Sequence, residues 1–225
     1  MSEILHIIPA AGKASRIGGI PKFLLPIGEE NFLINFHANE ILSNNKNVRK
    51  IIAVSSEYYE VIKRLDLNAE VIKVETKTMT ETVNEVLKHY STYKDYLVTM
   101  PDTYYEDQDV FERLLENYFK KKSQISLVLW NMQDYQKGKL GQVEVVSNKV
   151  IDVIDKNENC TYQKIWGAIL WNKELNALID VKDSHIGYII KPALQSEINV
   201  SYEIAEKIYY DCGTFSEYQT LVASQ

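Results

Sequence analysis

Short apolar runs alternate with amphipathic segments through the first half of the chain, and this alternation constrains the fold more than any other feature of the sequence. The apolar runs have the length of buried strands and lie at residues 5–9, 50–54, 70–74 and 96–100. The segments between them space their apolar residues at helical intervals and lie at residues 32–42, 57–65 and 80–90. Strands that alternate with helices in this way indicate right-handed crossovers and a mainly parallel sheet. The predicted class is therefore α/β, with a central, mainly parallel mixed sheet flanked by helices.

The second half of the chain has a different pattern. Strand-like runs follow one another with few helices between them, at residues 125–130, 141–146, 150–155 and 164–171. A helix, a strand and a closing helix are predicted at residues 184–195, 206–210 and 214–222. The sequence contains no repeat, low-complexity segment or linker, so a single domain over residues 1–225 is expected.

Charge and composition exclude several classes of partner. The formal net charge of -6 argues against a general affinity for nucleic acid or anionic membranes. The longest apolar runs are too short to span a bilayer, and the first residues do not resemble a secretory signal. The two cysteines, Cys160 and Cys212, lie far apart and outside any metal-ligand spacing, which is typical of the reducing cytosol. A cytoplasmic protein is therefore expected. Its oligomeric state stays open, and a homo-oligomer is compatible with the sequence.

The segment IIPAAGKASRIGGIPKFLLPIG, residues 7–28, is the most informative part of the sequence. An apolar strand opens into a loop of small residues that let backbone N–H groups approach a phosphate, and the loop also supplies cations. The candidate residues are Ala10, Ala11, Gly12, Lys13, Arg16 and Lys22. The segment has neither the GxxxxGK[ST] pattern nor the dinucleotide fingerprint. An ordinary strand-to-loop turn with exposed basic residues remains the alternative.

Two aspartates follow predicted strands. Asp102 comes after the strand at residues 96–100, and Asp211 comes after the strand at residues 206–210. Carboxylates at the carboxyl edge of an α/β sheet lie where such folds bind ligands, and two of them suit Mg²⁺, with water and phosphate completing the shell. The alternatives are a turn residue for Asp102 and a neighbour of a helix cap for Asp211.

These residues resemble the motifs of a known superfamily. Residues 10–16 with Pro21-Lys22 resemble the AAGxGxR…PK signature of the nucleotidyltransferases, which include sugar-1-phosphate nucleotidylyltransferases and the guanylyltransferase of molybdenum cofactor synthesis. The resemblance continues in order along almost the whole chain. Residues 101–103 resemble the GDN-type aspartate, residues 140–143 the YGVV turn, and residues 155–156 the EK pair. Residues 166–169 resemble the AGIY strand, and residues 210–214 resemble the WxDxGT element.

The resemblance implies a Rossmann-like (GT-A-like) fold and a reaction. An Mg²⁺-dependent enzyme would transfer NMP from an NTP to a sugar 1-phosphate or similar phosphorylated acceptor and release pyrophosphate. Residues 1–122 would bind the nucleotide, and residues 123–225 would bind the acceptor. The implied roles are catalysis for Arg16 and Lys22, metal binding for Asp102 and Asp211, nucleotide binding for Ala10, Ala11, Gly12, Lys13, Thr80 and Thr82, and acceptor binding for Gly141, Asp155, Lys156 and Gly167. The last group has alternatives, because Lys156 fits an exposed turn and both glycines fit strand bulges.

Departures from the family motifs leave the base and acceptor open. Ala14 replaces the second glycine of the loop, Asp155 replaces the glutamate of the EK pair, and residues 75–82 lack the usual base-recognition signature. The resemblance of residues 184–225 to the sugar-phosphate group favours a pyrimidine nucleotide.

Two other functions are weighed against this one. A glycosyltransferase of similar strand order usually needs an Asp-x-Asp motif, which Asp102-Thr103-Tyr104 lacks. A non-catalytic regulatory relative would generally lose the loop arginine or the metal aspartates, and this chain has all of them.

Overall fold

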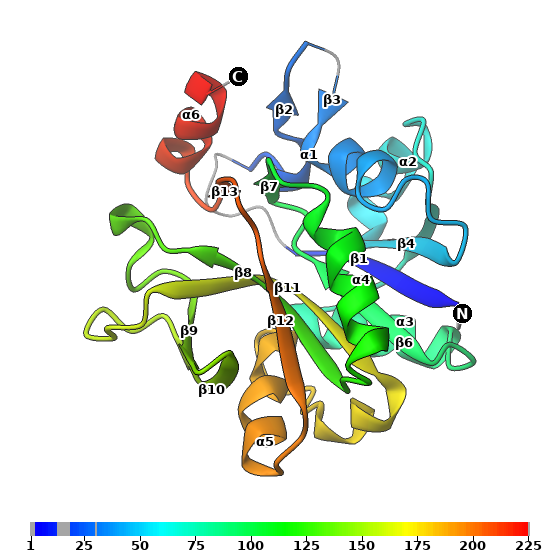
Figure 1. Cartoon of the computed structure of the whole chain (residues 1–225). Coiled ribbons are helices and arrows are strands. Elements are labelled where there is room, and N and C mark those ends of the chain that lie inside the picture. Colours follow the sequence, from blue (N-terminus) through cyan, green and yellow to red (C-terminus); the bar gives the residue numbers. More distant parts are fainter. Residues whose placement is uncertain (1–2, 13–18, 30, 225) are drawn as a thin grey trace.

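The computed structural model describes residues 3–12, 19–29 and 31–224. A mixed sheet of nine strands forms the centre of the molecule, with the path β10-β9-β11-β6-β1-β4-β5 (Figure 1). Strands β8 and β12 extend it, because β8 pairs with β11 and β12 pairs with β8. The predicted α/β class with a central mixed sheet flanked by helices is therefore confirmed.

The first half of the chain contributes the parallel part of the sheet. Strand β1 (Ile4–Ala10) lies between β4 and β6 and runs parallel to both. The other strands of this part are β4 (Val48–Val54), β5 (Glu70–Lys73) and β6 (Asp95–Thr99). The crossover helices are α2 (Ser56–Lys63) and α3 (Met79–His89). All four strands were predicted within two residues of their ends.

The second half continues the sheet in mostly antiparallel pairs. Strand β11 (Lys164–Asn172) runs antiparallel to β6, β8 and β9 and so joins the two parts. The other strands are β8 (Ile125–Asn131), β9 (Gly141–Val146), β10 (Lys149–Asp155) and β12 (Val200–Ile204). Because β11 pairs with β6 of the first half and with β8 and β9 of the second, it places residues of the two halves side by side.

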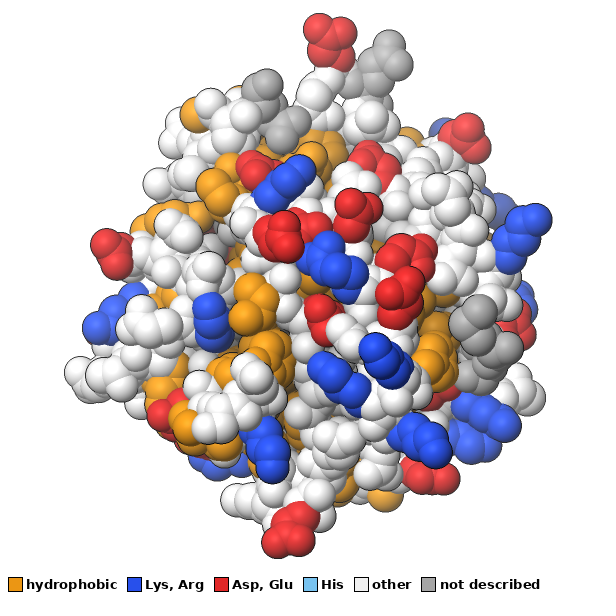
Figure 2. Space-filling view, in the orientation of Figure 1, with side chains coloured by type: hydrophobic (Ala, Val, Ile, Leu, Met, Phe, Trp, Pro, Cys, Tyr) orange, Lys and Arg blue, Asp and Glu red, His pale blue; other side chains and the backbone are white. Residues whose placement is uncertain are grey.

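Alternation along β1 explains the two packing layers. Leu5 and Ile7 point to the face covered by α3 and by α5 (Ile190–Gln195), whereas Ile4 and Ile8 point to the opposite face. The opposite face is covered by α2, α4 (Val110–Lys120), α1 (Leu33–Asn35) and the π-helical turn η2 (Phe36–Glu40). Acidic and basic side chains intermingle over the face that carries α4 and β12 (Figure 2).

Several predicted elements need correction. Helix α4 and strand β12 were not predicted, and the helix expected at residues 32–42 is a short α-turn followed by η2. The helix expected at residues 184–195 begins as a 3-10 turn, η5 (Ile186–Ile189), before α5. The strand expected at residues 206–210 is β13 (Tyr209–Asp211), which pairs outside the main sheet with β7 (Thr103–Tyr105). Asp211 therefore ends a strand rather than following one.

The remaining elements are short, apart from the last helix. They are η1 (Lys22–Leu24), β2 (Pro26–Ile27), β3 (Asn31–Phe32), η3 (Asp134–Gln136), η4 (Lys173–Leu178) and α6 (Phe215–Ser224). Among the described residues, no helix has the length and apolar content needed to cross a membrane.

Candidate active site

The small-residue loop begins where β1 ends, at the carboxyl edge of the parallel strands. Ala10 is the last residue of β1, and Ala11 is buried beside it. Lys13 and Arg16 lie outside the described residues, so their roles stay predictions. Lys22 opens the η1 turn directly after Pro21, whose extended backbone cannot continue a helix. The loop therefore returns to the sheet edge at Lys22.

Lys22 and Asp102 form an ion pair at this edge. Lys22 Nζ lies 3.0 Å from Asp102 Oδ2, and both side chains are partly buried. Asp102 occupies a tight turn after β6, in which the Thr103 backbone N–H and hydroxyl both donate to the Met100 carbonyl. The turn thus fixes the direction of the Asp102 carboxylate.

The β7–β13 ribbon brings Asp211 to the same place. Asp211 is the register partner of Thr103, and the Cys212 backbone N–H donates to the Asp102 carbonyl at 2.9 Å. Both aspartates line one cavity. The structure therefore brings together two carboxylates that are far apart in the sequence.

The charges around Asp211 favour a cation. Burial, together with the nearby Asp102 and Glu217 carboxylates, raises the pKa of Asp211 to about 7, although Lys22 acts in the opposite direction. Glu217, which the sequence did not indicate, is held by Lys139 at 3.0 Å and by the Thr214 hydroxyl at 2.8 Å.

The donor set suits Mg²⁺ bound together with a phosphate. Within residues 3–12, 19–29 and 31–224, no group of three or more His, Cys, Asp or Glu side chains is arranged to hold a metal ion. Magnesium is commonly bound by one or two carboxylates plus substrate phosphates and water. Asp102 and Asp211 fit that pattern, and a divalent cation between them would relieve the repulsion that raises the pKa of Asp211.

The cavity that the two aspartates line has a volume of about 360 Å³. Three of the predicted acceptor-binding residues, Gly141, Asp155 and Lys156, line it together with Lys22. Gly167 is not among the lining residues. A Cβ at Gly167 would lie 2.7 Å from the Tyr209 ring and 2.8 Å from the Trp130 ring, so this glycine is required for packing behind the site.

Trp166 forms an apolar wall of the cavity. Its indole is only 6% exposed and is confined between two glycines. A Cβ at Gly141 would lie 2.0 Å from Trp166 Nε1, and a Cβ at Gly187 would lie 2.0 Å from Trp166 Cζ2. The two glycines therefore form a slot that sets the position of the ring.

His185 lies beside this wall and was not predicted as a site residue. His185 Nε2 lies 3.2 Å from Asp155 Oδ2, and the Tyr188 hydroxyl lies 3.4 Å from the same oxygen. Burial alone would raise the pKa of Asp155, but His185, Lys156 and Tyr188 outweigh it and lower the pKa. His185 lines the cavity, and its Nδ1 is buried without a hydrogen-bond partner among the described residues.

Thr80 and Thr82 lie in the first turn of α3, and both are buried. The Thr82 hydroxyl is bonded within the turn, to Thr76 Oγ1 at 2.6 Å and to the Thr78 carbonyl at 3.0 Å. The Thr80 hydroxyl has no partner within the part of the chain that the structure describes. Neither residue lines the cavity, although the adjacent Met79 does, so their contact with a base stays a prediction.

Two buried histidines support the turn that carries Asp102. Burial lowers the pKa of His37 to about 4, so its ring is neutral. Its Nε2 donates to the Thr103 carbonyl at 2.9 Å, because a carbonyl can only accept. His37 Nδ1 must then accept from the Thr99 hydroxyl at 2.8 Å, and Thr99 in turn accepts from His6 Nε2 at 2.8 Å. The network fixes the tautomer of each ring, and no sequence motif indicated it.

Strand-end carboxylates share a cavity with lysines at the carboxyl edge of an α/β sheet, where such folds bind ligands, and this is compatible with a nucleotidyltransferase. The chain belongs to the family of MobA-like NTP transferase domains, since a sequence model of that family matches residues 6–166. The superfamily inferred from the sequence motifs is thereby confirmed. The matched range includes Lys22, Asp102 and Lys156 and ends before Asp211.

Two solved structures have the same fold. One is a Bacillus anthracis protein assigned as a glucose-1-phosphate thymidylyltransferase, whose structure was determined in complex with sucrose. Its sequence is 18% identical to this chain, and the two structures superpose with a TM-score of 0.83 over 98% of this chain and 94% of that one. The other is the inositol-1-phosphate CTP transferase of T. maritima, 14% identical with a TM-score of 0.74, over 97% and 94% of the two chains. No curated protein sequence matches the chain.

Proposed function

We propose that the enzyme transfers NMP from a pyrimidine NTP to a sugar 1-phosphate or a similar small phosphorylated acceptor, with Mg²⁺ as cofactor. An acceptor phosphate oxygen forms a bond to the α-phosphorus of the NTP. The bond from that phosphorus to the bridging oxygen of the β-phosphate breaks, and pyrophosphate leaves. Such transfers depend on positioning and charge neutralisation rather than on a protein nucleophile.

The observation that supports this proposal most directly is the meeting of Asp102, Asp211, Lys22 and Lys156 around one cavity. The two carboxylates are placed to hold Mg²⁺, which would neutralise charge on the triphosphate. Lys22 and the sequence-predicted Arg16 would bind the triphosphate oxygens. Lys156, with Asp155 and Gly141 beside it, would bind the acceptor on the other side of the two aspartates.

The choice of substrates rests on the structural relatives and on the size of the cavity. The two similar structures are described as a thymidylyltransferase acting on glucose 1-phosphate and a CTP transferase acting on inositol 1-phosphate. Both names specify a pyrimidine nucleotide and a small cyclic phosphate. A cavity of about 360 Å³ suits an acceptor of that size. We also propose a cytoplasmic location, which suits two buried, unpaired cysteines.

Pyrophosphate release tests the reaction. CTP, UTP, dTTP, ATP and GTP are each combined with a set of sugar 1-phosphates, inositol 1-phosphate and alcohol phosphates, with Mg²⁺ and with EDTA. We expect release only when NTP, acceptor and Mg²⁺ are all present, and most with a pyrimidine NTP. Sugar transfer from a nucleotide sugar would favour a glycosyltransferase, and nucleotide binding without turnover would favour a regulatory protein.

Asp102→Asn and Asp211→Asn should each abolish turnover while the circular dichroism spectrum stays native. Each change removes the charge of one of the two carboxylates that would hold Mg²⁺ in this cavity. Asp134→Asn, in the exposed η3 turn, is the matched control and should retain activity. Near-normal Mg²⁺-dependent turnover in both site variants would contradict the metal assignment.

A further inference from the structure

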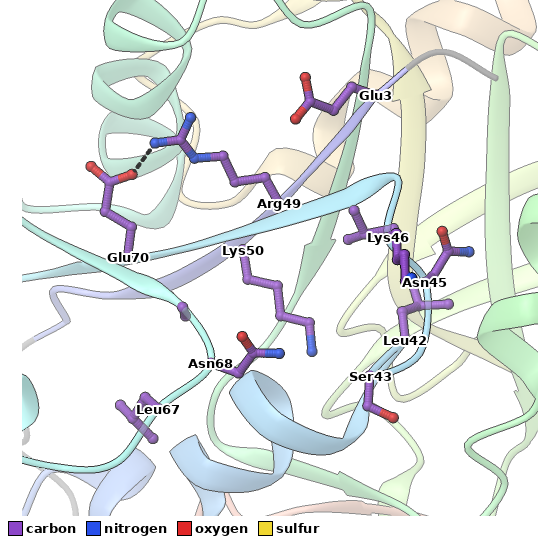
Figure 3. A pocket seen from close by; sticks show the side chains of 12 residues that line it. Glu3, Leu42, Ser43, Asn45, Lys46, Arg49, Lys50, Leu67, Asn68 and Glu70 are labelled. Carbon is purple, nitrogen blue, oxygen red and sulfur yellow. Dashed lines mark hydrogen bonds and ion pairs between the residues drawn. The ribbon is translucent and has the colours of Figure 1, made fainter.

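A second cavity, of about 660 Å³, lies at the opposite edge of the sheet and shares no residue with the active-site cavity. It is formed where β4 and β5 begin, by the segments around residues 42–50 and 67–70 (Figure 3). The feature that distinguishes this cavity is Lys50, a buried lysine in β4 directly before the buried apolar residues 51–54. A charged residue at a buried strand position contradicts the local pattern, and such exceptions are expected at functional sites.

Lys50 is 5% exposed, and its ammonium is incompletely paired. Lys50 Nζ donates to the Ala38 carbonyl at 2.7 Å, near the end of η2. An ammonium has three donors, so one carbonyl leaves the others to solvent or to a ligand. Burial lowers the pKa of Lys50 to about 8, and no carboxylate near it offsets that effect. The cavity therefore contains a buried cation that an anion would stabilise.

The carboxylates around the cavity are directed elsewhere. Glu70 accepts from Arg49 at 2.5 Å and from the Tyr90 hydroxyl at 2.7 Å, so it already has a cationic partner. Figure 3 shows Glu3 on the Arg49 side of the cavity, away from the Lys50 ammonium. Within the described part of the chain, the acidic side chains thus leave Lys50 without a counter-ion.

The groups that face Lys50 are neutral or basic. In Figure 3 the Lys50 ammonium ends between Asn68 and Ser43, and Asn45 lies farther along the segment of Ser43, where its amide donates to Glu112. The exposed Lys46 adds a second positive charge at the rim. Amide, hydroxyl and ammonium donors around one point are the groups that bind oxyanions.

We propose that this cavity is a binding site for a small oxyanion of the phosphate type, with Lys50 as its charged ligand and Asn68 as a facing hydrogen-bond donor. The site is separate from the proposed nucleotidyl transfer and does not depend on it. A carboxylate shares the acceptor chemistry of a phosphate, so the experiment compares the two.

Amide NMR of the full chain tests the site directly. Inorganic phosphate and, separately, acetate are titrated against chloride at constant ionic strength. We expect saturable shifts at the backbone amides of Ser43, Asn68 and Ala69 with phosphate, and weaker ones with acetate. Equal or stronger binding of acetate would overturn the assignment to the phosphate type. Shifts that are absent, unsaturable or equal with chloride would overturn the site itself.

Lys50→Met removes the charge and retains most of the side-chain volume. Affinity for phosphate at this cavity should fall about tenfold or more, as expected for the loss of a hydrogen bond from a charged donor. The control Lys94→Met makes the same charge change at an exposed position and should bind as the native protein does. Phosphate in the catalytic cavity is recognised separately by shifts at Gly141 and Lys156, which Lys50→Met should leave unchanged. Unchanged phosphate affinity in Lys50→Met would overturn the proposal.

Asn68→Asp tests phosphate binding at this cavity independently, in case Lys50→Met does not fold. Asn68 is exposed, so the change does not disturb the core. It places a carboxylate opposite the Lys50 ammonium and supplies the anion from within the protein. Phosphate should then no longer shift the Ser43 and Ala69 amides, and persistence of those shifts would refute the site.

Discussion

Replacing Gly187 by alanine tests the slot that holds Trp166. The new Cβ would lie 2.0 Å from Cζ2 and 2.6 Å from Cη2 of the indole, whereas ordinary contact begins at 3.4 Å. The ring must therefore move by 3.4 minus 2.0, or about 1.4 Å, and Gly141 confines its other edge. Overpacking of this kind costs about 1–3 kcal/mol of the free energy of unfolding.

Urea denaturation of four proteins measures this cost. The native chain, Gly187→Ala, Trp166→Phe and the double variant form a double-mutant cycle. Phenylalanine is shorter than the indole and does not reach the positions of Cζ2 and Cη2, so alanine at Gly187 should cost much less in that background. An equal loss in both backgrounds, or no loss in the native one, would refute the clash.

The same change has a kinetic consequence if Trp166 is a wall of the acceptor site. A misplacement of about 1 Å in a positioning group can cost roughly 10²-fold in rate. The loss should appear in kcat/KM for the acceptor, while KM for the NTP stays close to the native value. A rise confined to the KM of the NTP would mean that the wall borders the nucleotide instead.

Three further changes are expected to have separable effects. Arg16→Ala should lower kcat roughly 10²-fold, as for the loss of one donor to developing charge; a rise only in the acceptor KM would contradict that role. Lys156→Ala should weaken acceptor binding and leave NTP affinity by calorimetry almost unchanged; a large loss of NTP affinity would contradict the division of the cavity. Burial alone would raise the pKa of Asp107, but hydrogen bonds from Arg113 and a backbone N–H outweigh it and lower the pKa. Its stabilising contribution is therefore present above the unfolded pKa, about 3.9, and is lost as pH falls through the folded value. Asp107→Asn should have a lower Tm than the native protein at pH 7, and a gap that persists at about pH 2 would contradict the pairing.

The strands of the parallel part could be predicted because each is a compact apolar run. Helix α4 was missed although its buried residues, Val110, Phe111, Leu114, Leu115 and Tyr118, have helical spacing. Helix α4 was therefore predictable from the sequence alone. Strand β12 was harder, because only Val200 and Ser201 are buried and the strand is defined by pairing with β8. Its existence depends on a partner about seventy residues earlier in the chain.

The site was predictable only where a motif marked it. Motif order indicated Asp102, Asp211 and Lys156, and the structure places all three around one cavity. Glu217 and His185 have no motif and become site residues only because folding brings them beside Asp211 and Asp155. Long-range pairs of this kind follow from tertiary packing, which no local pattern encodes.

The β7–β13 ribbon can form only late in the synthesis of the chain. It joins segments that lie far apart along the chain; its Tyr210 and Glu106, for example, are 104 residues apart. At about 5–20 residues per second, a ribosome needs roughly 5–20 s to add that interval. Throughout this time a nascent chain has Asp102 but lacks Asp211, so under the proposed metal assignment it can fold its parallel strands and still be unable to consume NTP. If Asp211 holds the metal ion as we propose, catalytic competence arrives only once β13 has paired with β7.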